Sequence, residues 1–76
     1  MLKYLKFTAI RLDDEGNILE EGPIYILDNQ VPLCISEYYG YTAALLYKDA
    51  DSLMLLESPE EVMSKFGIEM DEGILN

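Results

Sequence analysis

Apolar and polar side chains alternate at the start of the chain, over residues 2–12. Leu5, Phe7 and Ala9 occupy alternate positions, and most of their neighbours are more polar. A period of two places successive side chains on opposite faces of a sheet, so this run predicts a β-strand. Neither Gly nor Pro interrupts it.

A polar turn with the sequence DDEGN follows at residues 13–17. Gly16 is placed for a left-handed backbone, which suits a hairpin with a bulge. The second strand of this hairpin is predicted to begin at Ile18. The Gly-Pro pair at 22–23 is expected to bend or break that strand, because Pro has no N–H to donate in a central ladder. The strand is expected to resume over residues 24–27.

Three further short strands are predicted over residues 31–35, 41–47 and 53–57, which are apolar stretches of strand length. Pro32 is expected to place the first of them at a sheet edge or a bulge. Residues 36–48 are also compatible with a helix, and the pattern leaves both alternatives open. A glycine and nearby tyrosines in this segment disfavour the helix.

The clearest local signal predicts a helix over residues 58–66. Ser58 is a good N-cap, Pro59 suits the first helical position, and Glu61 stands three residues after the cap. Gly67 is a suitable terminator for the last turn. The apolar face expected to dock on the sheet consists of Val62, Met63 and Phe66.

These elements predict one α+β domain over residues 1–76. Its architecture is a small antiparallel sheet or partly closed barrel of four to five short strands, with one short C-terminal helix. Residues 69–76 are expected to form a loose tail. Half of the residues are apolar, and one short helix covers little of a sheet. We therefore expect apolar surface to remain for burial against another chain, with a homodimer as one form of this.

Charge narrows the possible partners. The chain has 15 acidic residues, 5 basic residues and no His, for a net charge of −10. This balance argues against direct binding to nucleic acid or to an anionic membrane, and it favours a partner protein with a basic surface. The longest uncharged run, residues 38–47, is far shorter than the roughly 20 residues that span a bilayer. No signal peptide is recognisable, so a cytoplasmic location is expected.

The composition also disfavours catalysis and cofactor binding. Without His the chain lacks the commonest general base and metal ligand, and its single cysteine, Cys34, cannot form a disulfide within the chain. Cys34 lies in an apolar stretch and is expected to be a small buried residue. A chain of this size leaves little room for a substrate pocket. We therefore expect no enzymatic activity, no cofactor and no metal site.

Two groups of residues are candidates for partner binding. The acidic group can be an anionic face that imitates backbone phosphates, or a solvated turn that keeps the protein soluble. The tyrosine group can supply interface anchors, or can fill or flank a thin core. On one continuous strand, the second and third tyrosines would share a face and the first would point away. The candidates are Asp13, Asp14, Glu15, Glu20 and Glu21 in the acidic group, and Tyr38, Tyr39 and Tyr41 in the tyrosine group.

Together these features predict a non-enzymatic, acidic protein-binding module. Its most concrete form is an inhibitor that occupies the basic surface of a nucleic-acid-handling protein. In charge and length alone the chain is similar to phage-encoded inhibitors that imitate DNA, and this likeness assigns no residue a role. The alternative is a self-assembling structural or accessory subunit whose acidic residues serve solubility.

Overall fold

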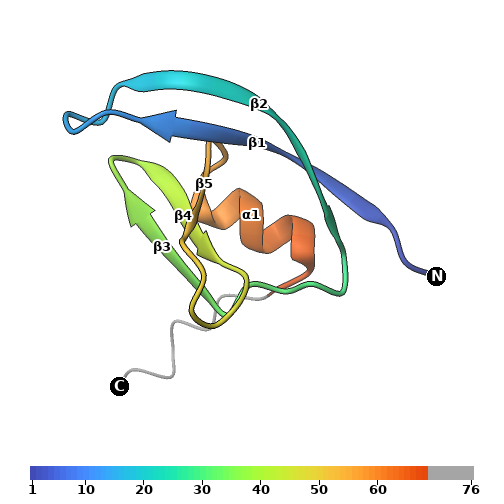
Figure 1. Ribbon diagram of the computed structural model, residues 1–76. Coiled ribbons are helices and arrows are strands. Elements are labelled where there is room, and N and C mark those ends of the chain that lie inside the picture. The colour runs from blue at the N-terminus through green and yellow to red at the C-terminus, as the bar shows by residue number, and fades with distance from the viewer. Residues whose placement is uncertain (69–76) are drawn as a thin grey trace.

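An open five-stranded antiparallel sheet forms the framework of the computed structural model, which describes residues 1–68 (Figure 1). The strand order is β2-β1-β5-β4-β3, and one helix follows the last strand. The α+β class is therefore confirmed, while the predicted tail lies outside the described residues. The elements are β1 (Tyr4–Leu12), β2 (Ile18–Leu27), β3 (Cys34–Tyr38), β4 (Tyr41–Leu45), β5 (Leu53–Leu55) and α1 (Pro59–Phe66).

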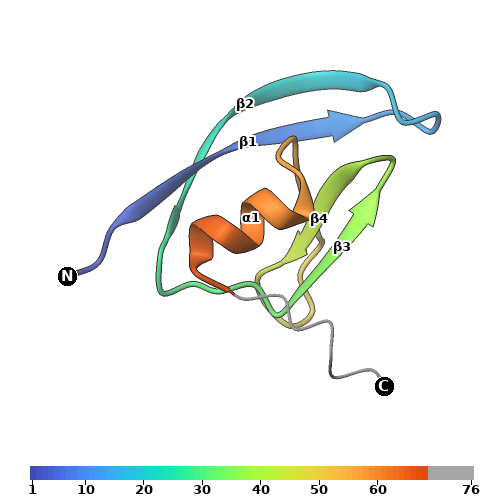
Figure 2. The same cartoon turned by 180° about the vertical axis from the view of Figure 1, so that it is seen from behind.

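Two hairpins, β1–β2 and β3–β4, make up most of the sheet. They cross at an angle, and α1 lies in the space between them in both views (Figures 1 and 2). The short strand β5 links the hairpins, because Leu55 pairs with Ala9 of β1 on one side and with Thr42 of β4 on the other. The two halves of the molecule thus share a narrow ladder and depend on packing for the rest of their attachment.

The core lies between the sheet and the helix. Its buried side chains come from both hairpins, from β5 and from α1, and Phe7 and Val62 are fully buried. Phe66 of α1 stacks on Phe7, with ring centroids 5.4 Å apart. The predicted docking of the helix through Val62 and Phe66 is confirmed. The core consists of Phe7, Ile26, Ala44, Leu55 and Val62.

Both ends of α1 carry the caps that its sequence predicts. At the start, the Ser58 hydroxyl accepts the N–H of Glu61. At the end, Gly67 adopts a left-handed conformation with φ of 74° and donates its N–H to a carbonyl of the last turn. Ile68 donates its N–H to the Met63 carbonyl, which completes a Schellman motif. Local sequence therefore determines where this helix begins and ends.

Strand β2 runs unbroken through Gly22 and Pro23, so the predicted break is wrong. Pro23 lies opposite Thr8 of β1, and the N–H and C=O of Thr8 both point away from β2. The N–H donates to the Glu57 carboxylate, and the C=O accepts the N–H of Leu56. The nitrogen of Pro23 therefore faces the outer edge of the sheet, where no donor is needed.

The segment 36–48 is a hairpin, which excludes the helical alternative. Its first strand is β3, which lies later in the chain than the predicted strand at 31–35. Pro32 has no N–H, and the Leu33 N–H bonds to the Leu45 carbonyl, so pairing begins after the proline. The predicted strands at 41–47 and 53–57 are confirmed, with shorter bounds.

Cys34 is exposed, which corrects the expectation that it would be buried. It begins β3, the outermost strand on its side of the sheet, and it pairs only with the last residue of β4. The next residue, Ile35, packs against the core, so Cys34, which alternates with it along the strand, points away from the core.

Apolar side chains also remain exposed on both hairpins, as expected. Among residues 1–68, no helix is long and apolar enough to cross a membrane. The large exposed apolar residues of the strands and their turns include Tyr4, Ile18, Leu19, Tyr25, Val31, Leu33, Tyr38, Tyr39 and Tyr47.

We expect Phe7→Ala to lower the free energy of unfolding by about 3–5 kcal/mol, because it removes a fully buried ring and the surface on which Phe66 stacks. Ser58→Ala removes one capping hydrogen bond and should cost about 1 kcal/mol. Urea unfolding followed by circular dichroism measures both values. Equal losses in the two variants would contradict the packing of α1 described here.

Candidate functional site

The turns of the two hairpins meet at one end of the molecule. Figures 1 and 2 both place the β1–β2 turn beside the β3–β4 turn. The ring of Tyr39 lies so close to Gly16 that a Cβ atom at Gly16 would be 2.7 Å from the ring Cγ. The Tyr39 hydroxyl also donates to the Asp14 carbonyl at 3.5 Å. The acidic turn and the tyrosines, which are separate in the sequence, thus form one surface.

Asp13 builds the acidic turn from within. Its Oδ1 accepts the backbone N–H groups of Glu15 and Asn17 at 2.8 and 2.9 Å, and its Oδ2 accepts the side-chain amide of Asn17. The hydrogen bond from the Asn17 backbone is the main reason that the pKa of Asp13 is lowered from its ordinary value of 3.8. The carboxylate of Asp13 therefore holds the turn in shape, and the neighbouring carboxylates take no part in this hydrogen-bond network.

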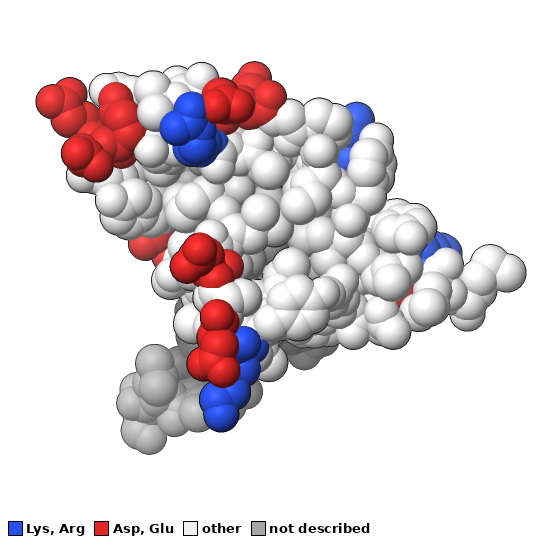
Figure 3. Space-filling view, viewed as in Figure 1, with Lys and Arg blue, Asp and Glu red and all other residues white. Residues whose placement is uncertain are grey.

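Asp14 and Glu15 are those neighbouring carboxylates. Both residues are exposed, and neither side chain makes a hydrogen bond or ion pair with a residue that the structure describes. Acidic atoms are conspicuous at the end of the molecule that carries the β1–β2 turn (Figure 3). Two free carboxylates on a shaped turn are well placed to meet positive charge.

Tyr39 occupies a strained position in its own turn. Tyr39 and Gly40 have φ of 53° and 84°, which are the two positive values required by a type I′ hairpin turn. A left-handed conformation costs a non-glycine residue roughly 1–2 kcal/mol. The contact with Gly16 and the hydroxyl bond to Asp14 are the interactions that hold Tyr39 in this conformation.

Tyr38 adds a second ring to this surface. It packs edge-to-face on Tyr39, with centroids 4.6 Å apart, and both side chains are about half exposed. Tyr38 lies directly opposite Tyr41 across the β3–β4 ladder. The expectation that Tyr38 and Tyr41 would point to opposite faces is wrong, because the turn at 39–40 interrupts the strand between them. We call the surface formed by Asp14, Glu15, Tyr38 and Tyr39 the tip surface.

The remaining two acidic candidates lie farther along β2, outside the tip surface. Glu20 stands opposite Arg11 and forms an ion pair with it, and both side chains are about two-thirds exposed. Glu21 makes no such pair with any residue in the described part of the chain. The five acidic candidates therefore divide into structural, paired and free carboxylates, a division that the sequence does not reveal.

The sequence does not predict the contact between Gly16 and the ring of Tyr39. The sequence identifies Gly16 as a turn residue through its left-handed conformation, which φ of 85° confirms. Nothing near it in the sequence indicates that an aromatic ring from 23 positions later packs on its open face.

Within residues 1–68, no group of three or more Cys, Asp or Glu side chains is close enough to hold a metal ion. No protein-family model, curated protein or solved structure matches the chain.

Gly16→Ala should destabilise the protein more than Gly40→Ala does. Both glycines have φ near 85°, so both variants bear similar backbone strain, but only a Cβ at Gly16 collides with the Tyr39 ring. At Gly40 nothing lies within 4 Å of the added atom. We expect an additional loss of about 1–3 kcal/mol in Gly16→Ala, measured by urea unfolding. Equal stabilities would show that Tyr39 does not pack on Gly16.

Proposed function

We propose that this protein is a non-enzymatic binding module that attaches to a basic surface of another protein through its tip surface. In its most concrete form, it inhibits a nucleic-acid-handling protein by occupying the surface that would hold the nucleic acid. The observation that carries this proposal is the packing of Tyr39 on Gly16, which joins exposed rings and free carboxylates in one patch.

Charge supports a basic partner. The chain carries a net charge of −10, and the carboxylates of Asp14 and Glu15 are free of pairing within the described residues. A protein that binds nucleic acid presents clustered Lys and Arg to the phosphates. Carboxylates on a projecting turn meet such a surface with complementary charge, which speeds association and selects the partner.

The tyrosines supply what charge alone does not. Exposed charge pairs contribute little affinity, whereas aromatic anchors carry much of the binding energy of interfaces. Tyr38 and Tyr39 offer two adjoining faces on which Arg or Lys side chains can stack. Because Tyr39 is already fixed by its turn and by Gly16, binding costs little further side-chain ordering.

The exposed apolar residues on the strands favour a second candidate function, self-assembly. Apolar association persists at high salt, whereas attachment through the tip surface weakens as salt screens its charges.

The test is capture of partners from an extract of the source cell on the immobilised protein, with elution by duplex DNA and identification by mass spectrometry. We expect the native chain to retain a nucleic-acid-binding protein that DNA displaces. The double variant Asp14→Asn/Glu15→Gln should retain about tenfold less of it, because two charge-assisted contacts are lost.

The matched control is Asp49→Asn/Asp51→Asn, in the loop after β4 at the end of that strand away from the turn. It removes the same number of charges, and Asn tolerates the left-handed conformation of Asp49. This control should retain the partner at close to the native level. Equal losses in the two double variants, or a captured protein that DNA does not displace, would contradict the proposal.

A further inference from the structure

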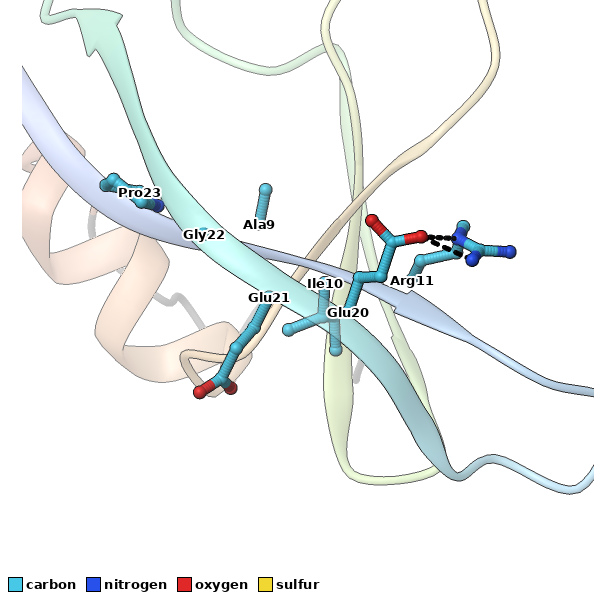
Figure 4. A pocket seen from close by; sticks show the side chains of 7 residues that line it. All are labelled: Ala9, Ile10, Arg11, Glu20, Glu21, Gly22 and Pro23. Carbon is cyan, nitrogen blue, oxygen red and sulfur yellow. Dashed lines mark hydrogen bonds and ion pairs between the residues drawn. The ribbon is translucent and has the colours of Figure 1, made fainter.

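A hollow of about 320 Å³ lies on the β1–β2 hairpin, between the turn and the core (Figure 4). It forms where two small residues of the paired strands, Ala9 of β1 and Gly22 of β2, stand opposite each other. An added Cβ at Gly22 would meet nothing within 4 Å, so the space is open. The hollow is shallow and largely open to solvent, so it suits one side chain laid along it rather than an enclosed small molecule.

An ion pair borders this hollow. Arg11 and Glu20 stand opposite each other, whereas the side chain of Glu21 points to the other face of the hairpin (Figure 4). Arg11 directs both its Nε and its Nη2 to the same oxygen of Glu20, Oε1. The other oxygen, Oε2, accepts no hydrogen bond from a residue that the structure describes. An incoming cation therefore finds one unused acceptor.

We propose that the hollow receives an arginine side chain of the partner protein. Its aliphatic stem would lie against the small apolar surface of Ala9 and Gly22, and its guanidinium would bond to the free oxygen of Glu20. A lysine fits less well, because its ammonium is strongly hydrated and cannot present a planar pair of donors. This inference rests on the proposed function, since it names how the basic partner is anchored.

The position of the hollow agrees with a single partner footprint. Arg11 lies two residues before Asp13, and Glu20 follows the same turn on the other strand, so the hollow adjoins the tip surface along one hairpin. The Arg11–Glu20 pair is largely exposed and hence weak, so it opens or rearranges at little cost when a second guanidinium arrives.

The test is an NMR titration of the ¹⁵N-labelled protein with N-acetyl-arginine amide at constant ionic strength. We expect saturable shifts at the amides of Ala9, Glu20 and Gly22. N-acetyl-citrulline amide has the same shape without the charge and should bind about tenfold more weakly. N-acetyl-lysine amide is the second comparison and should also bind more weakly than the arginine probe.

Gly22→Val is the decisive variant, because it fills the hollow where a Cβ has room and places a β-branched residue in a strand. It should abolish the saturable shifts, while Ser36→Val on the exposed edge strand β3 should leave them unchanged. Equal shifts with citrulline, or unchanged binding in Gly22→Val, would overturn this inference. The capture experiment with the tip variants does not use the hollow, so the proposed function is judged separately.

Discussion

The packing of the Tyr39 ring against Gly16 joins the two hairpins, which are otherwise linked by few backbone hydrogen bonds. Strand β5 has three residues, and one register pair, Ala9 with Leu55, links it to β1 within the described structure. At the helical end, Phe7, Phe66 and Val62 hold the halves together by burial. At the end that carries the hairpin turns, Tyr39 holds the halves together by packing on Gly16. A domain with so thin a core depends on both attachments, and the second also creates the tip surface through which binding is proposed.

Side chains satisfy backbone groups of β1 where strand pairing ends. Beyond the short β5, the Glu57 carboxylate accepts the N–H of Thr8, and the Lys65 ammonium donates to the Lys6 carbonyl at 2.7 Å. At the outer edge of β2, Pro23 presents no donor, which protects that strand from pairing with another chain. The proposed binding through side chains of the tip surface and the adjoining hollow is consistent with this blunted backbone edge.

Local signals in the sequence predicted the elements well, and long-range relations accounted for the errors. The caps of α1 and the turn at Gly16 are determined by neighbouring residues, and both were predicted. The continuity of β2 through Pro23 and the exposure of Cys34 depend on which strands lie at the edges. The strand order cannot be predicted from any single segment of the sequence. The candidate residues were likewise identified in two separate groups. The two groups form one surface because residues 16 and 39 are in contact, and no periodic pattern in the sequence predicts that contact.

The most direct test of this contact is a nuclear Overhauser measurement between the ring protons of Tyr39 and the α protons of Gly16. If the ring packs on the glycine as described, a strong cross-peak is expected, and the ring current should move the Gly16 α-proton resonances. Tyr39→Leu should return those resonances toward ordinary glycine values while α1 remains intact. Absence of the cross-peak in the folded native protein, with unshifted Gly16 α protons, would contradict a single tip surface built from both hairpins.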